Sequence, residues 1–153
     1  MSDSSPLFRD LAPELDQIAK DLDVRSVLIM RSTPTHMRVE ATAGEAQAVY
    51  AVGAEGRKGE AFEDARELYC ERVVNTRQAL FVRDSADDPD FAGNEDEAEH
   101  GLNNYLGVPV LGPDGDVFGT VCVLDDKARA YTPEQRARLD ELRAAAERAL
   151  ASE

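Results

Sequence analysis

Residues 105–126 read YLGVPVLGPDGDVFGTVCVLDD, and the pattern of this stretch decides the fold. Two apolar runs flank a Pro-Asp-Gly turn at residues 113–115, which predicts a β-hairpin. The first run contains Gly107 and Pro109, although a central strand that is paired on both sides rejects proline. We therefore expect this strand either to border a sheet edge or a pocket, or to carry a bulge that bends the sheet.

Helical and strand patterns alternate outward from this hairpin. Apolar residues recur at helical spacing over residues 6–22, where the helix either begins near Ala12 or is kinked at Pro13. Thr132 and Gln135 form the two halves of a capping box, which predicts the start of the last helix. The other predicted elements are strands at 24–32, 36–44, 48–52 and 79–84, a helix at 64–76, and an acidic loop from Ser85 to Gly101.

The short turns between these strands favour an antiparallel sheet with its helices gathered on one face, which is an α+β fold. No internal repeat and no linker divides the chain. We therefore expect a single domain over residues 1–153.

The charge balance narrows the range of partners. The chain carries 31 acidic and 17 basic residues, a net charge of -14. Because this charge repels phosphates, neither duplex nucleic acid nor an anionic membrane is an expected partner. No apolar run is long enough to span a bilayer, and the N-terminal MSDSSPLFRD lacks the features of a secretory signal, so we expect a cytoplasmic protein.

Lysine is scarce among the basic residues, whereas carboxylates are in excess. This composition suggests a salt-adapted, halophilic source, because high ionic strength screens the repulsion between carboxylates. The alternative is an ordinary acidic protein with high arginine usage. The lysines are Lys20, Lys58 and Lys127.

The residues that carry chemistry form no recognisable catalytic or metal motif. Cys70 and Cys122 are too few for a disulfide framework, and with His36 and His100 they lack the spacing of a zinc finger. A nucleophile elbow, a P-loop and an EF-hand loop are also missing from the sequence. Cys70 near a helix start is either a redox thiol or a buried apolar residue, and Cys122 shares a strand face with Thr120 and Leu124.

Four segments in order resemble a known family. ELYCERVVNT (67–76), ALFVRD (79–84), DDPDFAGN (87–94) and YLGVPVLGPDGDVFGTVCVLD (105–125) together resemble the GAF domain, particularly the modules beside histidine kinases and diguanylate cyclases. The resemblance covers about residues 5–150. It implies a PAS-related antiparallel sheet of about five to six strands, with the N- and C-terminal helices on one face and a ligand pocket on the other.

The resemblance also implies sensing rather than catalysis. We expect a small, unidentified ligand to bind between the sheet and the segments 44–65 and 84–104, and the terminal helices to form a homodimer that signals to a partner protein in trans. A covalently attached bilin is not expected, because neither cysteine has a histidine neighbour. The pocket candidates by position and residue type are Tyr50, Tyr69, Phe91, Asn103, Asn104 and Tyr105.

Two alternatives from other functional classes stay open. One branch of the GAF fold reduces free methionine sulfoxide with a set of cysteines, but Cys70 and Cys122 do not sit in the motifs of that branch. The other alternative is a ligand-free scaffold that only dimerises. The terminal helices themselves either form a dimer bundle or simply cover the bare face of their own sheet.

Overall fold

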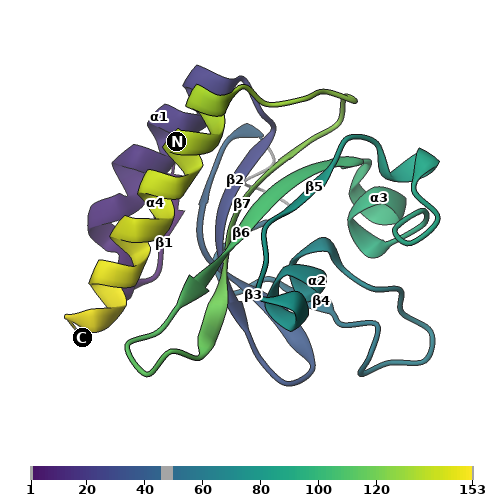
Figure 1. The fold of residues 1–153 in the computed structure, drawn as a ribbon, viewed down its shortest axis with the longest axis horizontal. Coiled ribbons are helices and arrows are strands. Elements are labelled where there is room, and N and C mark those ends of the chain that lie inside the picture. Colours follow the sequence, from purple (N-terminus) through teal and green to yellow (C-terminus); the bar gives the residue numbers. More distant parts are fainter. Residues whose placement is uncertain (1, 46–49, 153) are drawn as a thin grey trace.

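The hairpin of residues 105–126 lies inside the sheet in the computed structural model, which describes residues 2–45 and 50–152. All strand pairs are antiparallel, in the order β1-β3-β2-β7-β6-β5, and β4 also pairs with β3. The expected α+β fold is confirmed (Figure 1). The strands are β1 (Ser2–Ser4), β2 (Ser26–Ser32), β3 (His36–Ala43), β4 (Glu55–Arg57), β5 (Leu80–Val82), β6 (Asn104–Leu111) and β7 (Val117–Asp125).

The glycine and the proline of β6 have different explanations. Strand β5 pairs with residues 105–107 only, so Pro109 lies beyond its end, where the outer side of β6 has no partner strand among the described residues. The expected sheet edge is therefore confirmed for Pro109. Gly107 makes room for a neighbour on the same face, because a Cβ at this position would lie 2.0 Å from the hydroxyl oxygen of Tyr105.

The terminal helices cover one face of the sheet side by side (Figure 1). A 3-10 helix, η1 (Pro6–Leu11), leads into α1 (Ala12–Leu22), which has Pro13 in its first turn as expected. The capping box that begins α4 (Pro133–Ala151) is confirmed, because the Thr132 side chain accepts from the Gln135 N–H and the Gln135 side chain accepts from the Thr132 N–H. Leu15, Ile18, Leu22, Leu139, Leu142, Ala146 and Leu150 pack this face.

The opposite face of the sheet carries a second apolar cluster beneath short elements. These are α2 (Tyr69–Thr76), the 3-10 turn η3 (Ser85–Asp87) and α3 (Glu95–His100). Strand alternation separates the two clusters, because Leu28 and Leu124 face α2 whereas Ile29 and Val123 face the terminal helices. Among the described residues, the sheet therefore separates the terminal helices from α2 and the other short elements.

Three expected elements differ from the structure. The helix expected at 64–76 begins at Tyr69, because residues 66–67 pack their backbone against Gly59, where a Cβ would lie 2.6 Å from the Glu67 nitrogen. The expected acidic loop contains α3, which Asn94 caps by accepting from the Glu97 N–H at 2.9 Å. Of the strand expected at 48–52, residues 48–49 lie outside the described residues, and residues 50–52 form no strand.

Within residues 2–45 and 50–152, no helix combines the length and the apolar character that crossing a lipid bilayer requires.

Candidate functional site

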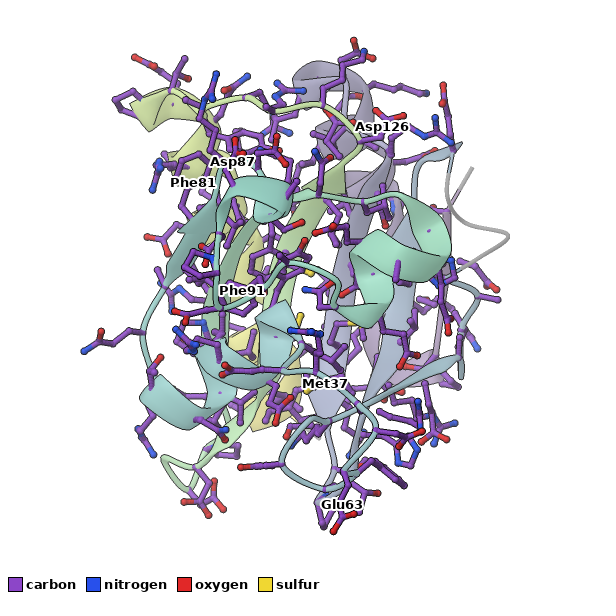
Figure 2. The ribbon with its side chains drawn as sticks, turned by 90° about the vertical axis from the view of Figure 1, so that its right-hand side faces the viewer. Met37, Glu63, Phe81, Asp87, Phe91 and Asp126 are labelled. Atoms are coloured by element: carbon purple, nitrogen blue, oxygen red, sulfur yellow. The ribbon has the colours of Figure 1, made fainter. Side chains whose placement is uncertain are left out.

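A cavity of about 60 Å³ lies between the sheet and the elements on the α2 face. Figure 2 looks onto this face, with Met37 and Phe91 near its centre. The walls are mostly aliphatic, and acidic side chains and a histidine gather at one end. The lining residues are Leu28, Met30, Met37, Val39, Tyr50, Ala54, Glu55, Gly56, Leu68, Cys70, Glu95, Asp96, His100, Tyr105 and Leu124.

The polar end of the cavity is built around Tyr50 and Asp96. The Tyr50 hydroxyl donates to the Asp96 Oδ1 at 2.5 Å, and the His100 ring packs edge-on against the Tyr50 ring at 5.3 Å. Burial raises the pKa of Asp96 above its ordinary value. Burial and the Asp96 charge together raise the pKa of Tyr50, so its hydroxyl stays protonated and donates. The oxygens of Asp96 therefore provide hydrogen-bond acceptors at this end of the cavity.

A sulfur-centred cluster lies in the wall beside this cavity. Cys70 on α2 and Cys122 on β7 place their Sγ atoms 3.8 Å apart, and both thiols are buried. The Thr120 hydroxyl donates to the Cys70 Sγ at 3.2 Å, and the Tyr105 hydroxyl lies 3.2 Å from the same sulfur. One sulfur atom therefore has three polar neighbours in an otherwise apolar wall.

The two thiols of this cluster are not equivalent. Burial alone raises the pKa of the Cys70 thiol, but its hydrogen bonds with Cys122, Thr120 and Tyr105 outweigh that effect and lower it. Burial raises the pKa of Cys122, and its hydrogen bond and electrostatic interaction with Cys70 raise it further. Cys70 also occupies the first turn of α2, where the helix dipole favours a thiolate. Cys70 is therefore the more acidic thiol of the two.

Helix α2 is fixed in place by a buried carboxylate. Glu71 is 1% exposed and accepts from the N–H groups of Gly59 at 2.8 Å, Glu60 at 3.0 Å and Leu68 at 3.0 Å. Charge-assisted hydrogen bonds of this kind are stronger than neutral ones. They tie the first turn of α2, including Cys70, to the segment that follows β4.

Of the four aromatic pocket candidates, two line the cavity and two pack behind it. Tyr50 and Tyr105 line the cavity. Tyr69 lies behind them, stacked on Tyr105 at 4.8 Å with its hydroxyl donating to the Leu102 carbonyl at 3.0 Å. Phe91 is buried against Tyr69 at 5.3 Å and also stays outside the lining.

The two asparagine candidates do not line the cavity. The Asn104 amide donates to the carbonyls of Arg83 at 3.0 Å and Arg129 at 2.9 Å, and its Oδ1 accepts from the Tyr131 hydroxyl at 2.6 Å. Asn103 donates to the Asp84 Oδ1 at 2.9 Å. Both side chains join loops to the start of β6, so their contacts support the fold.

Sequence reasoning missed two parts of this site. It left Cys70 as either a redox thiol or a buried apolar residue and placed Cys122 on a strand face; both are buried, but it did not place them side by side. It also placed Asp96 in an acidic loop without assigning it to the site, whereas Asp96 lines the cavity together with the exposed His100. The alternation of side chains along the strand could have placed Cys122 on the cavity face, with Leu124. Nothing in the local sequence indicates the inward position of Asp96.

Solved structures of similar fold belong to both sensory and enzymatic proteins. A GAF domain from an Acinetobacter phosphoenolpyruvate-protein phosphotransferase is 18% identical, with a TM-score of 0.70 over 98% of this chain and 85% of that one. A putative GAF sensor protein from Burkholderia vietnamiensis is 17% identical, with a TM-score of 0.69 over 97% and 84%. The type II free methionine-R-sulfoxide reductase from Thermoplasma acidophilum is 16% identical, with a TM-score of 0.70 over 95% and 93%.

No curated protein matches this chain by sequence. The family profile described as "GAF domain", in contrast, matches residues 10–150. This range includes the cavity, α1 and all but the last residue of α4, and the solved GAF domains share the fold. The chain therefore belongs to the GAF domain family.

Proposed function

We propose that this chain is a regulatory GAF module that binds a small ligand in the cavity on the α2 face. The carrying observation is a largely aliphatic cavity with the hydrogen-bonded pair Tyr50 and Asp96 at its polar end. Apolar walls with a few converging polar groups are typical of small-molecule sites. The mostly aliphatic lining therefore supports ligand binding better than it supports a reaction at the Asp96 carboxylate.

The lining also indicates the chemical class of the ligand. Asp96, Glu55 and Glu95 disfavour a carboxylate or a phosphate and attract a hydrogen-bond donor. Arg57, 3.8 Å from Glu95, offsets only part of their charge. A volume of about 60 Å³ holds a few water molecules, so the ligand is small unless side chains move. The matching ligand is a small aliphatic amine with its ammonium group at the Asp96 end.

The position of the cavity supports a route for the signal. Leu28 and Leu124 line the cavity, and the residues adjacent to them in the same strands, Ile29 and Val123, pack against the terminal helices. A ligand that shifts β2 or β7 therefore acts on the packing of α1 and α4. We propose that binding changes the relative populations of the arrangements of these helices.

A homodimer and a signalling partner in trans are part of this proposal. The apolar stripe of α4 packs on its own sheet, so a dimer contact uses the outer side of the helix. A cytoplasmic setting is supported by the cysteine count, because two cysteines are too few for the disulfide framework typical of small secreted domains. Light scattering after size-exclusion chromatography, with and without ligand, tests the dimer; a monomer in both samples contradicts it.

The first experiment is native mass spectrometry of the purified chain, compared with its denatured mass. We expect a co-purified small molecule, or else a rise in melting temperature with short alkylamines and none with the matching carboxylates. Saturation at 100 times Kd stabilises the folded state by about 2.7 kcal/mol. Equal responses to the amine and the carboxylate would refute the assigned ligand class.

A variant that fills the cavity tests the site itself. Ala54 lines the cavity, so Ala54→Leu should abolish the amine-dependent shift. Ala137→Leu, on the exposed side of α4, adds the same bulk away from the cavity and should keep the shift. Loss of the shift in both variants, or retention in both, would place the ligand elsewhere.

A second candidate function is the reduction of a small sulfoxide, which the 3.8 Å separation of the Cys70 and Cys122 sulfurs favours. In that reaction two thiols and a sulfoxide yield a disulfide, a sulfide and water. The test is consumption of free methionine-R-sulfoxide in the presence of dithiothreitol. Activity that is lost in both Cys70→Ser and Cys122→Ser would support this candidate, and no turnover by the unmodified chain would remove it.

A further inference from the structure

We propose that Cys70 and Cys122 form a reversible redox pair, which a small peroxide oxidises to an intramolecular disulfide between α2 and β7. The two sulfurs lie 3.8 Å apart although 52 residues separate them in sequence. The distance must shorten to about 2.05 Å in the disulfide, so the sulfurs move together by about 1.8 Å. This movement is within the reach of side-chain rotation combined with a small shift of α2.

Access to the oxidant distinguishes the two thiols. Cys70 lines the cavity, whereas Cys122 is 0% exposed and is not part of the lining. Hydrogen peroxide is uncharged and close to water in size, so the cavity admits it and the acidic end does not repel it. The structure therefore assigns Cys70 as the thiol that reacts first and Cys122 as the one that closes the disulfide.

The surroundings of Cys70 support a reactive thiolate. Tyr105 and Thr120 both place hydroxyl groups 3.2 Å from its sulfur, and hydrogen bonds donated to a thiolate stabilise it. Gly107 allows this geometry, because any side chain at this position would occupy the site of the Tyr105 hydroxyl. Tyr105, Thr120 and Gly107 are therefore positioning residues for Cys70.

The chemistry balances with peroxide as the only oxidant. The Cys70 thiolate attacks one peroxide oxygen, the O–O bond breaks, and the products are a Cys70 sulfenic acid and hydroxide, which takes up a proton to form water. Cys122 then attacks the sulfenic sulfur, the S–O bond breaks, the S–S bond forms, and a second water leaves. Two thiols and one peroxide thus yield one disulfide and two waters. A small dithiol reverses the reaction by thiol–disulfide exchange.

This reaction also alters the cavity. Leu68 and Cys70 at the start of α2 are lining residues, so drawing α2 toward β7 moves part of the wall. The oxidation itself depends only on the two thiols and on access for peroxide. It therefore stands or fails independently of the ligand proposed above.

Intact-mass spectrometry of the full chain provides the test. The reduced protein is treated with one equivalent of hydrogen peroxide, denatured, and alkylated at free thiols. We expect a monomer that has lost two hydrogen atoms and carries no alkyl label. Because Cys70 and Cys122 are the only cysteines, such a mass identifies their disulfide. Two labels after peroxide treatment, or a disulfide-linked dimer, would overturn the proposal.

Variants assign the two roles. Cys122→Ser should stop at a Cys70 sulfenic acid that a dione reagent traps, whereas Cys70→Ser should show no dione adduct at the same peroxide dose. Adducts in both variants at equal rates would refute the order of reaction. Each variant is first compared with the unmodified chain by circular dichroism, so that unfolding is recognised.

A matched pair of tyrosine variants tests the positioning. Tyr105→Phe removes the hydroxyl beside Cys70, and we expect oxidation about tenfold slower, the effect of losing about one hydrogen bond. Tyr131→Phe removes a buried hydroxyl that bonds Asn104 instead, and its rate should match that of the unmodified chain. Equal rates in these two variants would remove the role of Tyr105.

Discussion

Replacing Asn104 with alanine should destabilise the fold much more than the same change at its neighbour. Asn104 is 0% exposed and makes three hydrogen bonds of 2.6 to 3.0 Å, with the Arg83 and Arg129 carbonyls and the Tyr131 hydroxyl. Its removal leaves the buried Tyr131 hydroxyl and two partly buried carbonyls without this partner, at about 1 to 1.5 kcal/mol each. We therefore expect a loss of about 3 to 5 kcal/mol, a large share of the 5 to 15 kcal/mol typical of a domain.

Urea unfolding followed by circular dichroism measures this loss, and Asn103→Ala is the control. Asn103 donates one hydrogen bond, to Asp84, so its replacement should cost about 1 kcal/mol. Because neither asparagine lines the cavity, neither change should alter ligand affinity in the folded protein. Equal losses in the two variants, or a weakened ligand with unchanged stability for Asn104→Ala, would refute the structural role of Asn104.

Other perturbations probe α2, the sheet, the cavity and the surface. Glu71→Gln should cost about 2 to 4 kcal/mol in urea unfolding, because its carboxylate serves three backbone donors. Glu67→Gln weakens a bidentate ion pair with Arg72 near the surface and should cost about 1 kcal/mol, and similar losses in the two variants would contradict this. Gly119→Ala should lower stability by about 2 to 3 kcal/mol, because its Cβ would lie 1.8 Å from the Met30 carbonyl oxygen; an unchanged melting temperature would contradict the close approach. Burial raises the pKa of Asp96 in the folded state. The stability that Asp96 contributes is therefore fully present below about pH 4, the pKa in the unfolded chain, and is lost as the pH rises through the pKa in the folded state. Asp96→Asn should accordingly match the unmodified chain near pH 4 and exceed its stability at neutral pH, and a constant difference in unfolding free energy would refute this. If the source is halophilic, stability should rise with salt because the net charge of -14 is screened, and a fall would reject the idea.

Local chemistry explains which parts of the fold were predictable. The capping box at Thr132 depends on neighbouring residues and was predicted, and the edge position of Pro109 was one of the alternatives that its sequence left open. A signal for α3 was present in Asn94 at its start and Gly101, with φ of 70°, at its end, but the charge run favoured a loop. The late start of α2 could not be predicted, because it depends on contacts of Gly59 across a loop.

The candidate site was predicted only in part, for a similar reason. Tyr50 and Tyr105 were chosen by residue type and both line the cavity. Asn104 was chosen in the same way, although neighbouring residues of a strand face opposite sides, so it could not share a wall with Tyr105. The contact between Cys70 and Cys122 brings a helix onto a strand, and no local pattern contains that information.

The division of the sheet into two faces has a consequence for protein engineering. In β2 and β7 the even-numbered residues Leu28, Met30, Cys122 and Leu124 lie on the cavity face, and the odd-numbered Val27, Ile29, Val121 and Val123 lie under the terminal helices. A library restricted to even positions would therefore vary specificity while leaving the helix-bearing surface intact. A library restricted to odd positions would vary the packing of the terminal helices while leaving the cavity lining unchanged.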